Sequence, residues 1–250
     1  MATTSFAVAT ASSSSLPTNP VIDSVTAKAH FRVAQYMMEA GIKLGLQSAT
    51  VASACTIYYR FFSVCNVKDY DTHLVGAAAI YLATKVEEQR VKLRDIINVC
   101  YRILHKSESP LEIGKRYWDL RESVVNCELL LIRMVKFNPK VTLPHKYLVH
   151  YLKSLGDWIE PDVWKATPIC QMAWAMLRDS YHSHMCIRIQ PQHLAVAVIY
   201  FALQCYGVVV PENEQAQKKW WQVFSEDLKE EKVQEIVLEL IEMYDMETKV

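Results

Sequence analysis

The stretch that decides the fold is residues 74–83, with the sequence LVGAAAIYLA, which contains no charged side chain. Asp71 stands shortly before it and is suited to cap the start of a helix. A helix that is apolar on every side must be enclosed by other helices. The alanines and the glycine are small enough for those neighbours to approach closely. The stretch therefore predicts the central helix of a helical bundle.

Helical periodicity surrounds this central stretch in the first half of the chain. Apolar residues recur every three or four positions from residue 27 onward, which predicts a first helix. We expect a second helix capped by Ser48, a fourth over about 93–102 and a fifth over about 115–135. The apolar positions of the first helix are Ala27, Phe31, Ala34, Met38, Ile42 and Leu46.

The second half of the chain repeats this arrangement. Residues 197–202 (AVIYFA) match residues 78–83 (AAIYLA) at four of six positions, 119 residues further on. Matching helices on both sides favour a duplicated helical unit over a chance likeness between two apolar helices. Prolines in this half predict helix starts at Pro144, Pro168 and Pro191. Glycines predict helix stops at Gly156 and Gly207. A short helix at Trp220 and Trp221 and a last helix over about 233–241 complete the half.

These patterns predict an all-α protein of two tandem helical bundles with about five helices each. Residues 1–26 are rich in alanine, serine and threonine, so we expect them to form a disordered tail. The first bundle is expected over residues 27–143 and its repeat over residues 144–250.

Composition excludes several classes of function. The six glycines form neither a GxGxxG nor a GxxxxGK[ST] spacing, which argues against kinase, P-loop and Rossmann phosphate sites. The 27 basic and 27 acidic residues balance, so net charge gives no reason for nucleic-acid binding. No apolar run approaches the roughly 18 residues of a membrane span. The sequence suggests no cofactor.

The seven cysteines favour an intracellular protein, because their count is odd and none forms a CxxC pair. They are expected to be reduced and packed as small hydrophobic residues. His182 and His184 stand two residues apart without a nearby third ligand, so we interpret them as surface or loop residues rather than a metal site. The sequence leaves open whether the protein works in the nucleus, the cytoplasm or both.

Four segments carry a family resemblance. Residues 80–89 (IYLATKVEEQ) resemble the third-helix signature of the cyclin box, in the form found in transcription-type cyclins. Residues 93–99 (LRDIINV), 127–137 (CELLLIRMVKF) and 218–224 (KKWWQVF) are similar to later segments of the same two-box family, in the same order. The resemblance covers residues 28–245, nearly the whole chain apart from the tail.

The resemblance implies a non-catalytic subunit that activates a cyclin-dependent kinase by binding its regulatory helix. For the subgroup that is most similar, the implied partner is cyclin-dependent kinase ten, in a heterodimer. The family's kinase-binding residues carry over to Lys85, Glu128, Ile132 and Phe137.

The residues themselves leave alternatives open. Lys85 suits the C-terminal end of a helix, where its charge meets the negative end of the dipole. Glu128 stands among apolar residues, and a buried carboxylate needs a partner, so an internal ion pair between the two is an alternative to direct kinase contact. Two further functions also remain: a tandem cyclin-fold protein that clamps DNA, like transcription factor B, or a helical scaffold without a kinase.

Overall fold

The structure, a computed structural model, describes residues 24–107, 109–211 and 218–247. Within these ranges it contains helices, turns and loops and no β-strand, as the sequence predicts. The expected tail falls outside the described residues except for residues 24–26, which already belong to the first helix.

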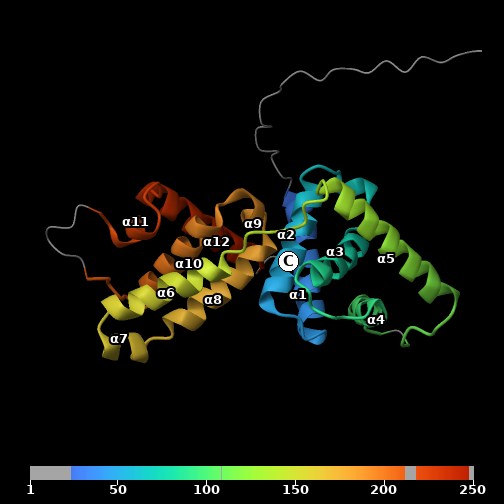
Figure 1. The fold of residues 1–250 in the computed structure, drawn as a ribbon, viewed down its shortest axis with the longest axis horizontal. Helices are drawn as coiled ribbons and strands as arrows, with labels where there is room; N and C mark the ends of the chain where they lie inside the picture. Colours follow the sequence, from blue (N-terminus) through green and yellow to red (C-terminus); the bar gives the residue numbers. More distant parts are fainter. Residues whose placement is uncertain (1–23, 108, 212–217, 248–250) are drawn as a thin grey trace, which may run out of the picture.

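In the described part of the first half there are five α-helices and one short 3-10 helix, and Figure 1 shows how the α-helices are arranged. Asp71 caps α3 as predicted, since its carboxylate accepts hydrogen bonds from the backbone N–H groups of His73 and Leu74. Ser48 is not the cap of α2, because Gln47 occupies that position and Ser48 is already helical. The elements are α1 (Ser24–Lys43), α2 (Ser48–Phe62), η1 (Val67–Asp69), α3 (Thr72–Val86), α4 (Leu93–Leu104) and α5 (Lys115–Met134).

The second half follows the predicted order and adds two short helices, α7 and α9, that the sequence did not predict. They have six and four residues, which is too short for an apolar period to be recognised. The elements are α6 (His145–Trp158), α7 (Pro161–Ala166), α8 (Ile169–Asp179), η2 (Ser180–His182), α9 (Met185–Arg188), α10 (Pro191–Cys205), α11 (Trp220–Phe224) and α12 (Glu230–Glu247).

Each half has a central helix and a hydrophobic core of its own. In the first half α3 packs against α1, α2, α4 and α5, and in the second half α10 packs against α6, α8, α11 and α12. Ala78, Ala79 and Ala83 of α3 are fully buried, as are Ala197 and Ala202 of α10. Figure 1 shows the two bundles side by side, with α1 and α2 facing α8 and α9. The two all-α bundles are therefore present as predicted.

Of the two glycines predicted to stop a helix, Gly207 does so and Gly156 does not. Gly207 ends α10 in the left-handed region, with φ of +63°, and its N–H donates to the Gln204 carbonyl. Gly156 does not end α6, because the helix continues to Trp158. A Cβ at Gly156 would lie 3.1 Å from Nε1 of Trp164, so this glycine serves close packing against α7. Ile42 was predicted to lie on the apolar face of α1. Its side chain is 73% exposed, so that prediction is wrong for this residue.

Aromatic rings and histidines join the two halves. Phe31 of α1 stacks on His182 at 4.7 Å between ring centroids and belongs to the core of the second half. The Tyr59 hydroxyl donates a 2.8 Å hydrogen bond to the His182 carbonyl, and His184 packs against Tyr59 and His30. His182 and His184 lie in the short connection between α8 and α9, so the interpretation as loop residues holds, but both are partly buried in the contact between the bundles.

Acidification is expected to destabilise this contact. Burial lowers the pKa of His30 and of His184 to about 4, and for His184 the nearby His30 and Arg188 add to the effect. An unfolded histidine has a pKa of about 6.5, so the unfolded chain binds more protons than the folded one between the two values. The stability that these two neutral histidines contribute is therefore fully present above pH 6.5. It is lost progressively as the pH falls toward 4.

Urea unfolding midpoints measured between about pH 7.5 and pH 4.5 test this expectation. A His184→Gln variant should lose stability less steeply than the unaltered protein over the same interval. Equal slopes for the two proteins would contradict the assignment of the pH dependence to this contact.

Candidate functional site

An ion pair joins the central helix of the first half to α5. Lys85, in the last turn of α3, places its Nζ atom 2.7 Å from Oε1 and 2.9 Å from Oε2 of Glu128. The Glu128 side chain is only 10% exposed, whereas that of Lys85 is 51% exposed. The internal ion pair that the sequence left open is thus present. The lysine is the half-exposed partner of this pair.

The surroundings of Lys85 stabilise its protonated, positively charged form. Partial burial lowers the pKa of Lys85, but the hydrogen bond and the charge of Glu128, together with Tyr81, outweigh this effect and raise it. Nζ also lies 4.0 Å from the centre of the Tyr81 ring. Tyr81 was not among the predicted site residues, although its spacing of four residues from Lys85 places both on one helix face. A held ammonium group has three N–H bonds and can donate to backbone carbonyls of a partner while still contacting Glu128.

The residues after Lys85 fix the end of α3 to its neighbours. Glu87 accepts a 2.6 Å hydrogen bond from the Ser53 hydroxyl of α2. Gln89 accepts hydrogen bonds from the Thr50 hydroxyl and the Gln47 N–H and donates to the Gly45 carbonyl. The hydrogen bonds of Glu87 and Gln89 therefore hold the end of α3, which carries Lys85, against its neighbours.

The other two candidate residues lie at the C-terminal end of α5. Ile132 is partly buried against the core of the first half. Lys136 and Phe137 both adopt left-handed backbone conformations, with φ of 55° and 56°, and the Phe137 N–H donates to the Ile132 carbonyl at 2.8 Å. Non-glycine residues rarely adopt this conformation. It leaves the Phe137 side chain 73% exposed beyond the end of the helix.

The site thus combines a half-exposed lysine at the end of α3 with exposed apolar side chains on α5 and just beyond it. Leu129, one residue after Glu128, is 49% exposed and was not among the predicted site residues. Its position within a continuous apolar run concealed that it faces solvent. An arrangement of this kind suits a helix of another protein, whose backbone carbonyls and apolar side chains it can contact.

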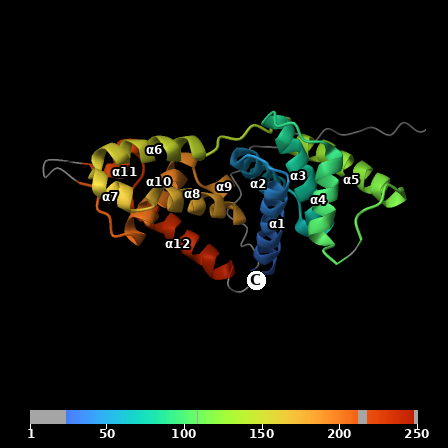
Figure 2. The same cartoon turned by 90° about the horizontal axis from the view of Figure 1, so that it is seen from below.

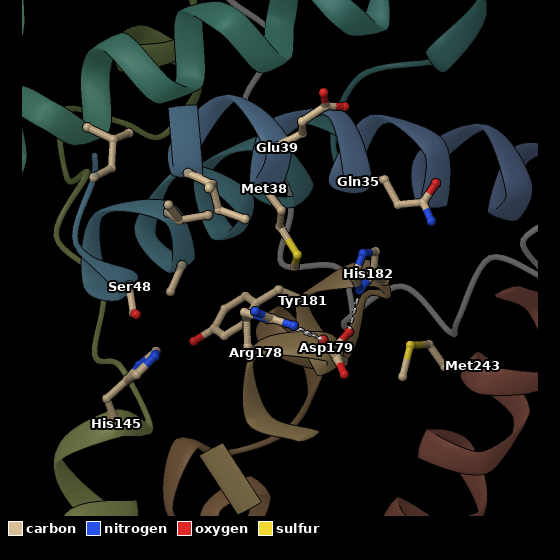
Figure 3. Close-up of a pocket in the computed structure, with 14 residues that line it drawn as sticks. Gln35, Met38, Glu39, Ser48, His145, Arg178, Asp179, Tyr181, His182 and Met243 are labelled. Atoms are coloured by element: carbon tan, nitrogen blue, oxygen red, sulfur yellow. Dashed lines mark hydrogen bonds and ion pairs between the residues drawn. The ribbon is translucent and has the colours of Figure 1, made fainter. Parts of the chain in front are cut away.

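A separate cleft lies between the two bundles. It has a volume of about 650 Å³ and is lined by residues of α1, α2, α6, α8, η2 and α12. Figure 3 shows Met38 pointing from α1 toward Tyr181 of η2, with the Arg178–Asp179 ion pair beside them. None of the four candidate residues lines this cleft.

The described ranges contain neither a cluster of metal ligands nor a membrane-spanning helix. No group of three or more His, Cys, Asp or Glu side chains there is arranged to hold a metal ion. None of the helices in the part of the chain that the structure describes is both long and apolar enough to span a bilayer.

Sequence comparisons match one family. A model described as the cyclin N-terminal domain matches residues 7–139. Cyclin-K of Danio rerio is 29% identical over 213 residues, which are 84% of this chain and 48% of that protein. Cyclin-L1-1 of Oryza sativa subsp. japonica is 30% identical over 215 residues, covering 84% of this chain and 47% of that protein. The chain spans about half the length of the curated relatives it matches.

Solved structures share the fold. A chain of the yeast RNA Pol II CTD kinase CTDK-1 complex superposes with a TM-score of 0.67 at 16% identity, covering 87% of this chain and 66% of that chain. A chain of the Chaetomium thermophilum CAK complex bound to ATP-gamma-S gives a TM-score of 0.64 at 18% identity, covering 92% and 67%. At these identities the likeness concerns the fold.

Proposed function

The chain belongs to the cyclin family, as a member of the transcription type, and on this premise we propose that it is a regulatory subunit that activates a cyclin-dependent protein kinase. In this proposal the chain carries out no chemistry of its own. It binds the regulatory helix of the kinase with Lys85, Glu128, Ile132 and Phe137, and thereby holds the kinase in its active conformation.

The mechanism is a shift of a conformational equilibrium. A kinase transfers phosphate only when its Lys–Glu ion pair and its metal-binding aspartate are aligned. A rigid groove that fits the regulatory helix only in the aligned position stabilises that conformation. Shifting a population from 1:99 to 99:1 requires about 5.5 kcal/mol of differential affinity. Interfaces above about 2,000 Å², which are common in signalling assemblies, have enough area to provide it.

The observation that carries the proposal is the ion pair between Lys85 and Glu128. Glu128 is nearly buried and contacts Lys85, whose side chain stays half-exposed, and α5 and its C-terminal end also carry the exposed side chains of Leu129 and Phe137. Chains of two kinase complexes share the fold of this one, which supports the same kind of partner here.

The finer identification rests on the sequence motifs. We propose that the chain is similar to cyclin Q, also called cyclin M, and that it forms a heterodimer with cyclin-dependent kinase ten. The relatives cyclin-K and cyclin-L1-1 belong to the transcription-type branch and support the broader assignment. We propose the nucleus, the cytoplasm or both as its location. The division into units 27–143 and 144–250 is likewise proposed, and it fits the two hydrophobic cores.

Affinity purification of the full chain from cells, followed by mass spectrometry, tests the kinase assignment. We expect a cyclin-dependent kinase in near-stoichiometric yield, and added purified chain should activate that kinase toward a peptide substrate. Recovery of the chain without any kinase would favour the scaffold alternative. A salt-dependent shift of duplex DNA in a gel would favour the DNA-binding alternative instead.

A further inference from the structure

The last helix of the second half carries a face that its own fold does not use. Figure 2 shows α12 along the outer edge of this half, and it packs against α10 and η2. Its inward side is buried at Val233, Val237 and Leu240. Leu238 lies near the opposite side of the helix and is 60% exposed, and Ile241, one turn further, is 40% exposed.

This exposed pair has a counterpart in the first half. Residues 124–134 and 233–243 are identical at five of eleven positions, and the alignment pairs Leu129 with Leu238 and Ile132 with Ile241. Leu129 is also exposed, at 49%, and Ile132 is partly exposed. A single exposed leucine is ordinary. The same two aliphatic residues on the outer face of both last helices indicate that each bundle has a docking face at the same place.

The two faces differ in charge. Helix α12 has seven acidic residues and one basic residue, Lys232, which gives 1 − 7 = −6. Helix α5 has four basic and three acidic residues, which gives 4 − 3 = +1. The two helices also differ in charge next to the exposed aliphatic residues, because the alignment pairs Glu242 of α12 with Arg133 of α5. Glu231, Glu235 and Glu242 are exposed and lie on the same side of the helix as Leu238.

We propose that the outer face of α12, made by Leu238 and Ile241 between Glu231, Glu235 and Glu242, binds a basic amphipathic helix of a protein other than the kinase. Charge complementarity selects this occupant, since aliphatic side chains bordered by carboxylates match a helix with leucines on one face and lysines or arginines beside them. The α5 face would remain available for the kinase. The two faces would let one chain connect the kinase to a second protein.

A labelled synthetic peptide of the length of α12, with leucines at helical spacing and lysines and arginines elsewhere, tests the proposal by fluorescence anisotropy with the full chain. We expect saturable binding that weakens as salt is raised. A Leu238→Ala variant should bind about tenfold more weakly, because the peptide leucines lose an apolar contact. A Glu231→Lys, Glu242→Lys double variant should lose at least about tenfold.

Matched changes on α5 provide the controls. Leu129→Ala removes the corresponding leucine, and an Asp119→Lys, Glu122→Lys double variant changes the net charge by the same amount at exposed positions. Both should bind the peptide within about twofold of the unaltered chain.

Four results would overturn the proposal. They are equal weakening by the α5 variants, equal binding of a peptide whose leucines are replaced by glutamine, equal binding of an acidic peptide, and the absence of saturable binding. Self-association of the chain that the α12 variants abolish would assign the face to a second copy instead. Circular dichroism checks that every variant remains helical.

Discussion

Replacing Glu128 with alanine is expected to abolish kinase activation, by at least about a hundredfold, while the fold is retained. The substitution removes the nearly buried carboxylate that orients Lys85, whose side chain is half-exposed and can be hydrated when it is unpaired. The loss of folding stability should therefore be no more than about 1 kcal/mol, as for exposed ion pairs. Titration of the purified kinase with each variant, with phosphate transfer as the readout, measures the effect.

Lys85→Ala separates the functional role of the pair from its structural role. It should abolish activation equally, but it leaves the Glu128 carboxylate nearly buried without its partner. Removing one partner of a buried ion pair costs about 3–5 kcal/mol because the remaining charge is left uncompensated, so this variant should be the less stable of the two in urea unfolding.

A third variant, Glu122→Ala, is the control, because it removes an exposed carboxylate from the same helix. It should activate the kinase normally. If Lys85→Ala and Glu128→Ala retain helicity and full activation, the ion pair is structural only and the assignment of these two residues fails.

Replacing Tyr59 with alanine is expected to cause a large loss of folding stability. Tyr59 is completely buried, its ring packs on His184 at 4.5 Å between centroids, and its hydroxyl donates to the His182 carbonyl across the two halves. Truncating a buried aromatic residue to alanine costs about 3–5 kcal/mol, mainly through the cavity that remains. Thermal unfolding followed by circular dichroism measures this loss, and the two halves should then unfold at separate temperatures.

Tyr59→Phe is the matched control, since it removes only the hydrogen bond between the halves. Its cost should be about 1 kcal/mol, with one cooperative transition retained. An unfolding temperature of the alanine variant within a few degrees of the phenylalanine variant would show that this ring does not join the bundles.

The candidate site was only partly readable from the sequence. Lys85, Glu128, Ile132 and Phe137 were selected by resemblance, and the structure brings Lys85 and Glu128 together. Leu129 was missed, because the run from residue 129 to residue 132 is apolar at every position and gives no sign of which side chain faces solvent. Gln89 was missed as an anchor, because its partners lie more than 35 residues earlier in the chain.

Local chemistry determined the all-α class and the duplicated order of helices. The enclosed helix at 74–83 needs helices around it, and caps such as Asp71 and Gly207 act on their own neighbours in the chain. Such signals are short-range, so they can be read from residues a few positions apart.

Tertiary structure alone decided which groups meet. Gly156 was predicted to stop a helix but instead accommodates the Trp164 ring, and the two histidines predicted as surface or loop residues join the bundles. The sequence contains no trace of these contacts, because packing brings together residues far apart in the chain, and burial then decides whether a side chain is a cap, a spacer or a contact.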